Sequence, residues 1–338
     1  GESAESIDLL KHNRSYLVSI LSDLFVAINT SFVQQYDVPL WKPELLKNNL
    51  RDFMSGSSEH FFNIKDIPDE VFVAKKPKVG DIDTQVNKEL VLNLTEFLKS
   101  NIGQMIGPGK LLGYKAGNEQ YSSLWELIEP PIKIQIDLEF TKFENDVPRE
   151  WDKFAHSSSW ADLDASIKGV FHKYLIMSLT SLTTTDFILR TIYKSGKVKD
   201  EQVSDNMISF AVSSKEGGGL RKKYEPVIEN GKPVIIDGLP VMTKLPATGY
   251  TQNVESIFSI ILGGKLPTNF FSTNKSKFWS FVGLASIINE LLDESEKETI
   301  VESFINKLFG PAAQGLYRGD PGRDKQEKMV ALNKLLTT

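Results

Sequence analysis

The clearest pattern in the chain is a strict alternation of apolar and polar residues over nine positions, from Ile132 to Phe140. Even-numbered positions hold Ile, Leu or Phe, and odd-numbered positions hold Lys, Gln, Asp or Glu. Because successive side chains of a strand point to opposite faces of its sheet, this spacing predicts a strand with one buried face and one open face. Asp137 and Glu139 belong to the open face.

Apolar residues at three- and four-residue steps predict helices elsewhere in the first half of the chain. One helix is expected from about Ser6 to Thr30, and another from Asn87 to Ile102. The dipeptide Gly117-Asn118, set between two apolar segments, is typical of a hairpin turn. The other expected elements are a short strand at Leu50–Ser55, an irregular segment at 59–78, and strands at Val79–Val86, Leu111–Tyr114 and Tyr121–Leu127.

From Ser159 the chain changes character, and helical spacing becomes frequent. Ser159, with Asp162 three residues later, is typical of a helix start. Helices are predicted at Ser159–Thr180, through Phe187 and Ile192, and at Asn253–Leu262, Lys277–Leu292, Lys297–Leu308 and Asp324–Leu336, with strand-like segments within 205–250 and a linker at Gly310–Gly322. We therefore expect an α+β protein with a first domain over residues 1–150, which includes the N-terminal helix. A mainly helical second domain with a small β-hairpin region should follow over 151–310, then a linker and C-terminal helix over 311–338.

Composition narrows the class of protein without changing this outline. The 338 residues are enough for two domains, and 41% hydrophobic with 25% charged residues is typical of globular chains. No cysteine is present, which excludes disulfides, thiolate nucleophiles and cysteine-bound zinc or iron–sulfur clusters. The formal net charge of −5 means that any nucleic-acid contact is expected from a local basic patch.

Two observations bear on location. No apolar run reaches the length of about 18–20 residues that spans a bilayer. The segment from Gly1 to Asp8 is polar and acidic, which is unlike a secretory signal. The sequence therefore predicts a cytoplasmic protein with no membrane partner.

Three acidic residues are candidate metal ligands. Asp81 and Asp83 lie two residues apart in the strand expected at Val79–Val86, which puts both carboxylates on one face with Cα atoms about 7 Å apart. If the strand that carries Asp137 is a neighbour, the three carboxylates converge. Such a cluster is costly unless a divalent cation neutralises it, and Mg²⁺ prefers a few carboxylates together with phosphate oxygens. Two such ions about 3.5–4 Å apart can hold the attacking and leaving oxygens of an in-line displacement.

A turn of small residues, Gly56-Ser57-Ser58, precedes these acids. Gly56 lets the backbone come close to a phosphate, and Ser57 offers a hydroxyl and an amide at an expected helix start. A turn that binds a triphosphate beside acids that bind metal indicates a site for nucleotidyl transfer.

Gly56-Ser57, Asp81-Ile82-Asp83 and Asp137 together resemble the signature of the DNA polymerase beta-like nucleotidyltransferase superfamily, which includes poly(A) polymerases, CCA-adding enzymes and aminoglycoside nucleotidyltransferases. The resemblance covers residues 45–145 and implies a mixed sheet flanked by helices. It also implies an enzyme dependent on Mg²⁺ or Mn²⁺ that moves a nucleoside monophosphate from a nucleoside triphosphate to an acceptor hydroxyl and releases pyrophosphate. The segment 58–80, between the turn and the first acid, is longer than is usual in this family.

The resemblance also implies a role for each residue. Asp81 and Asp83 would bind both metal ions, and Asp137 would bind the catalytic ion and activate the acceptor hydroxyl. The turn Gly56-Ser57-Ser58 would hold the triphosphate. Glu139 shares the face of Asp137 and is the alternative ligand.

Two basic segments add candidate contacts. The segment Lys215–Lys223 combines a glycine run with Arg221 and Lys222. It is expected either to close over a triphosphate or follow a nucleic-acid backbone, or to be a mobile hairpin tip. The run Lys75-Lys76-Pro77-Lys78 is either a phosphate or nucleic-acid contact or an exposed loop.

The acceptor stays open at this point. An RNA 3′ end fits the additional helical domain and the local basic segments, whereas a protein side chain or a small molecule fits the acidic overall charge. A different class of function is a catalytically silent scaffold that keeps the fold for partner binding. The intact acids argue against a scaffold, because a silent copy has no physical reason to keep a costly carboxylate cluster.

Overall fold

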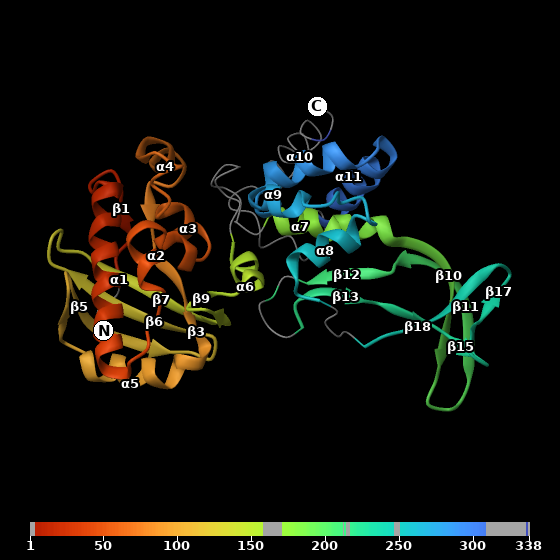
Figure 1. Cartoon of the computed structure of the whole chain (residues 1–338), viewed down its shortest axis with the longest axis horizontal. Coiled ribbons are helices and arrows are strands. Elements are labelled where there is room, and N and C mark those ends of the chain that lie inside the picture. Colours follow the sequence, from red (N-terminus) through yellow and green to blue (C-terminus); the bar gives the residue numbers. More distant parts are fainter. Residues whose placement is uncertain are drawn as a thin grey trace. The chain divides into compact units, whose positions relative to one another are not determined.

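The computed structural model describes residues 4–157, 171–211, 213, 217–246, 251–308 and 336. The chain divides into two compact units, Gly1–Ala165 and Ser166–Thr338, and Figure 1 labels most of their elements. Both units contain helices and sheets, which confirms the α+β prediction. The nucleotidyltransferase-type fold stays a prediction.

A five-stranded mixed sheet forms the centre of the first unit (Figure 1). Its strands lie in the order β3 (Ile82–Asn87), β7 (Lys133–Thr141), β6 (Gln120–Leu127), β5 (Gly109–Ala116) and β4 (Met105–Ile106). β3 and β7 run parallel, and the other neighbouring pairs are antiparallel. The strand predicted from the strict alternation is β7, and the predicted hairpin is β5–β6. Both predictions are confirmed.

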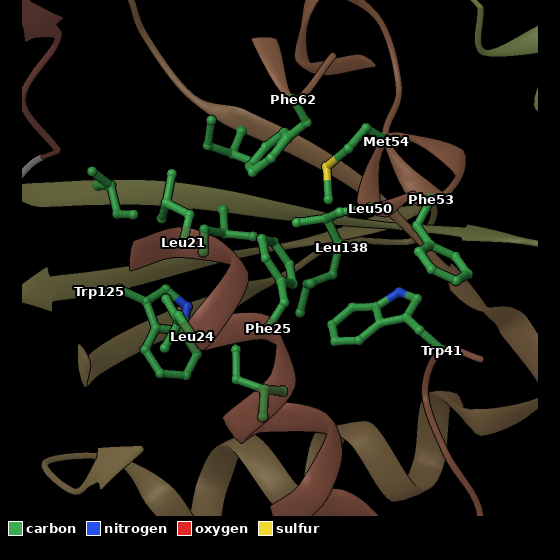
Figure 2. Packing of buried hydrophobic residues seen from close by; sticks show 14 of the residues in the cluster. Leu21, Leu24, Phe25, Trp41, Leu50, Phe53, Met54, Phe62, Trp125 and Leu138 are labelled. Atoms are coloured by element: carbon green, nitrogen blue, oxygen red, sulfur yellow. The ribbon is translucent and has the colours of Figure 1, made fainter. Parts of the chain in front are cut away.

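Two helices cover one face of this sheet, α1 (Arg14–Tyr36) and α5 (Val91–Asn101). Side chains of α1, such as Phe25, pack against Trp125 of β6 and Leu138 of β7 (Figure 2). These apolar positions are the buried half of the alternation. The polar half, which includes Asp137, therefore belongs to the opposite face of the sheet, which we call the open face.

The α1 helix has 23 residues and is apolar enough to cross a membrane by length and composition alone. Its apolar side is buried in the unit instead, with Leu17, Leu21 and Leu24 fully enclosed. A core helix passes the same test of length and composition, so α1 is weak evidence for a membrane span. The helix begins later than predicted because the Asn13 side chain accepts a hydrogen bond from the Tyr16 amide at 2.9 Å and caps it.

Residues 50–78 differ from the sequence prediction. Leu50–Phe53 forms a 3₁₀ turn rather than a strand, and the residue after it, Met54, meets Thr84 in a single bridge. The segment expected to be irregular contains two helices, α3 (Ser57–Phe61) and α4 (Asp69–Lys75). Asp69 and Glu70 favour the start of α4, because acidic side chains stabilise a helix N-terminus.

The strand predicted at Val79–Val86 is interrupted at Gly80-Asp81. β2 (Lys78–Val79) pairs with β1 (Ile7–Asp8), whereas β3 pairs with β7. The two parts of the predicted strand therefore belong to different sheets. The remaining elements of the first unit are α2 (Pro43–Asn48), β8 (Phe143–Glu144), β9 (Val147–Pro148) and α6 (Glu150–Ala155).

The second unit contains more β structure than the small hairpin region predicted for it. Its larger sheet has the order β11 (Val198–Asn206), β10 (Thr184–Ile192), β18 (Leu239–Lys244) and β14 (Tyr224–Pro226), with β17 (Ile235–Ile236) also paired to β18. Two further pairs are β12 (Ile208–Ala211) with β13 (Gly219–Lys222) and β15 (Ile228–Glu229) with β16 (Lys232–Pro233). The helix predicted through Phe187 and Ile192 is wrong, because these residues lie in β10. The run Thr183-Thr184-Thr185 and the isoleucines that follow are β-branched, which favours a strand.

The helices of the second unit follow the predicted spacing more closely. They are α7 (Phe171–Leu179), α8 (Val254–Ile261), α9 (Phe270–Asn274), α10 (Phe281–Leu291) and α11 (Glu294–Leu308). α10 begins after Ser280, whose hydroxyl accepts a hydrogen bond from the Gly283 amide at 3.0 Å. The predicted helix start at Ser159 lies outside the described residues, as does the C-terminal region 311–338 apart from Leu336.

Candidate functional site

Three carboxylates meet on the open face of the first unit, where β3 and β7 run side by side. Asp83 and Asp137 are direct partners in the register of these strands, and Asp81 immediately precedes β3. One carboxylate oxygen from each residue lies within 4.8 Å of those of the other two. The structure thus brings together the three acids that the sequence singled out.

The crowding of negative charge changes how these acids titrate. Burial, the charges of Asp81, Glu139 and Asp137, and a hydrogen bond with Asp137 raise the pKa of Asp83 to about 8. The pKa of Asp81 is also raised, first by burial and then by the charge of Asp137. Without a cation, the cluster therefore holds on to protons that isolated aspartates release.

Two glutamines orient the third acid. Gln135 precedes Asp137 by two residues on β7, and its Nε2 donates to Asp137 Oδ1 at 2.8 Å. Gln120 of β6 places its Nε2 3.5 Å from Asp137 Oδ2. Sequence reasoning did not single out either glutamine. The signal for Gln135 was its place on the polar side of the alternation.

The Gly56-Ser57-Ser58 turn lies beside the free edge of β3. The amide of Asp83 donates to Ser58 Oγ at 2.9 Å, and the amide of Ser55 donates to the Asp83 carbonyl at 3.0 Å. Gly56 has a φ of +56°, and a Cβ there would stand 3.9 Å from Asp83 Oδ2. A side chain would therefore be strained at this position and would come against the acids.

The side chain of Lys76 adds a positive charge to this side of the site. Lys76 follows α4, and its Nζ donates to Ser57 Oγ at 3.0 Å. Its positive charge opposes the rise in the pKa of Asp81. The long segment 58–80 thus folds back so that Lys76 contacts Ser57, in the turn that precedes the segment. This position favours the phosphate-contact alternative for Lys76 over the exposed-loop alternative.

Glu139 lies next to the cluster and also close to His156. Its Oε2 is 3.1 Å from His156 Nδ1, and the His156 carbonyl accepts a hydrogen bond from the Gly56 amide at 2.9 Å. Asp137, and not Glu139, is the acid whose carboxylate oxygen lies within 4.8 Å of those of Asp81 and Asp83, although the charge of Glu139 helps to raise the pKa of both. No local sequence pattern indicates these contacts of His156.

The basic candidates of the second unit lie on another sheet. Arg221 and Lys222 belong to β13, and Arg221 Nε donates to the Gly217 carbonyl at 2.6 Å. Part of the segment Lys215–Lys223 lies outside the described residues. Their role in binding a triphosphate stays a prediction.

Comparison with protein-family models and with curated proteins finds no match for this chain. Any chemistry assigned to the site must therefore rest on its geometry. Its carboxylate oxygens can bind a cation, and a hydroxyl, an amide and an ammonium group beside them can bind an anion.

Proposed function

We propose that this chain is a metal-dependent nucleotidyltransferase, which moves a nucleoside monophosphate from a nucleoside triphosphate to an acceptor hydroxyl. The observation that carries the proposal is the convergence of Asp81, Asp83 and Asp137 within 4.8 Å of one another. The second support is the anion-binding character of Ser57 and Lys76 at the edge of the same cluster.

The donor set suits a divalent cation. Mg²⁺ and Mn²⁺ prefer oxygen ligands, and the three carboxylates offer them from two neighbouring strands and the residue before one of them. The repulsion that raises the pKa of Asp83 is relieved when positive charge enters the cluster. Bound divalent cations would neutralise charge on the triphosphate and orient the attacking and leaving oxygens.

The chain's own groups divide the remaining work. The Gly56 turn lies against the acids and leaves room for a phosphate, while Ser57 and Lys76 donate hydrogen bonds to its oxygens. Asp137, buried and oriented by Gln135, accepts the proton of the acceptor hydroxyl. The acceptor oxygen forms a bond to the α-phosphorus, the bond to the bridging oxygen breaks, and pyrophosphate leaves with that electron pair.

The experiment that tests this function uses the full chain and each triphosphate labelled at its α-phosphate. Acceptors are an RNA pool, a protein pool and small hydroxyl compounds, each with Mg²⁺ or with a chelator. We expect label on an acceptor and an equal amount of pyrophosphate, both lost with chelator. If no acceptor gains label and triphosphate with Mg²⁺ leaves the melting temperature unchanged, the proposal is wrong and a silent scaffold is favoured.

Lys76 gives a prediction about the triphosphate. We expect Lys76→Ala to raise KM for the triphosphate by about 10- to 100-fold, because a charged hydrogen bond to a phosphate is lost. Initial rates over a range of triphosphate concentrations measure this. Lys78→Ala, at the exposed first residue of β2 in the same basic run, is the matched control and should leave KM within about twofold. If both substitutions raise KM equally, Lys76 acts only through the general positive charge of the surface and makes no specific contact with the triphosphate.

A further inference from the structure

An open groove of about 660 Å³ crosses the strands of the first unit beside the acids. Its lining residues come mainly from β5, β6 and β7 and include Leu112, Tyr114, Lys115, Ser122, Leu124 and Gln135. This volume lies in the range of sites that bind small organic ligands, about 300–1,000 Å³.

The groove adjoins the carboxylate cluster. Gln135 lines it, and the same side chain donates to Asp137 Oδ1 at 2.8 Å. A ligand in the groove therefore reaches the acid that is proposed to activate the acceptor hydroxyl. The Gly56 turn and Lys76 lie instead toward β3, the edge strand of the sheet, which leaves the groove free of the triphosphate contacts.

Strand register places a lysine at a fixed distance from the acids. Asp83 pairs with Asp137, Asp137 pairs with Ser122, and Ser122 pairs with Lys115. Directly paired residues share a face of the sheet, so these four residues form one row across the open face. Lys115 stands two strands from Asp137, which corresponds to about 10 Å between Cα atoms.

The two ends of the row differ in charge. Among the described residues that line the groove, Lys115 is the one charged side chain, and it is exposed. Leu112 and Leu124 supply a half-buried apolar floor in the groove, and Leu124 is the register partner of Gln135. The groove thus has an apolar floor and an exposed ammonium group, and Gln135 in its wall contacts the carboxylate of Asp137, which lies outside the groove.

We propose that this groove is the acceptor subsite and that the acceptor is a nucleotide unit. Its hydroxyl lies at Asp137, its sugar and base rest on the apolar floor, and its phosphate contacts Lys115. One nucleotide and the lysine side chain together span the distance that the register sets. This inference rests on the proposed function, and it names a phosphate-bearing acceptor in place of an acceptor of any kind.

The test compares acceptors that differ in phosphate. They are a nucleoside, its 5′-monophosphate, and a short RNA that ends in the same nucleoside. We expect Lys115→Ala to lower kcat/KM for the phosphate-bearing acceptors by about fivefold, and Lys115→Glu by about tenfold or more, with larger effects at low salt. The nucleoside should react equally with all three proteins. Lys115→Arg keeps the charge and should restore the rates.

Binding without triphosphate separates this inference from the proposed function. Calorimetric titration of the monophosphate and the RNA should show the same losses in Lys115→Ala, whether or not transfer occurs. Lys99→Ala, on the exposed side of α5 across the sheet, is the matched control. Use of the RNA alone identifies a polynucleotide end as the source, and use of the monophosphate identifies a free nucleotide. The inference is overturned if Lys115→Ala affects all three acceptors equally or affects none, or if the wild-type protein binds neither phosphate-bearing acceptor.

Discussion

Replacing Asp83 with asparagine should abolish nucleotidyl transfer, with a fall in kcat of at least about a thousandfold. Asp83 is the register partner of Asp137, and its carboxylate oxygen is within 4.8 Å of those of Asp81 and Asp137. An amide of the same size keeps the packing but removes the negative charge that would hold a divalent cation. Single-turnover transfer with saturating triphosphate measures the chemical step, and circular dichroism confirms the fold.

Matched substitutions make this result specific. Asp23→Asn, on the exposed side of α1, changes charge equally and should leave kcat unchanged. Asp137→Asn should be as damaging as Asp83→Asn, whereas Glu139→Gln should cost about tenfold or less, since Glu139 lies beside the three-acid group and is not part of it. If Glu139→Gln abolishes transfer and Asp137→Asn does not, the ligand set proposed here is wrong.

The acid cluster could be predicted in part from the sequence because it depends on a strong local pattern, the alternation of apolar and polar residues. The alternation in β7 fixes the face that carries Asp137, since a shift of one residue would turn its apolar side outward. Asp81 and Asp83 were expected on one face of a single strand, but Asp81 lies in the break between β2 and β3, and only Asp83 is held by the register of β3 with β7. The pairing of β3 with β7 was an assumption, because about 50 residues separate these strands and no local signal fixes such a partner.

Contacts between residues that are far apart in the sequence could not be predicted from it. Lys76 reaches Ser57 only because α3 and α4 fold the segment between them into a compact loop. Arg14 holds this loop from α1, donating to the carbonyl oxygens of His60, Phe61 and Ile67. In the second unit, β10 has apolar residues that fit both helical and strand spacing. Its pairing with β11 and β18 decides between them.

Metal-free protein should lose stability as pH rises, and Mg²⁺ should restore it. The pKa of Asp83 is about 8 in the folded chain, whereas aspartate in an unfolded chain titrates near pH 4. Between these values the folded state holds a proton that the unfolded state has released. The contribution of this group to the free energy of unfolding is thus fully present at low pH and is lost as pH rises toward 8. Asp81, whose pKa is also raised, acts in the same direction.

Thermal unfolding at about pH 5.5 and pH 8, with chelator or with millimolar Mg²⁺, measures this linkage. Binding at a hundredfold excess over Kd is worth about 2.7 kcal/mol, so Mg²⁺ should raise Tm at pH 8 by about 5 to 10 °C, and by less at pH 5.5, where protons compete for the carboxylates. The Asp83→Asn variant isolates the contribution of the Asp83 carboxyl to the stability. Because it removes a repelled charge, it should raise the metal-free Tm at pH 8 by about 3 °C and abolish the response to Mg²⁺. A variant that is less stable than the wild type at pH 8, or that still responds to Mg²⁺, would show that the three carboxylates do not act as one cation site. If loss of the Asp83 charge stabilises the metal-free protein, then repulsion among the three carboxylates destabilises it. A bound cation relieves that repulsion, which is the behaviour expected of a site that uses three like charges to bind a cation.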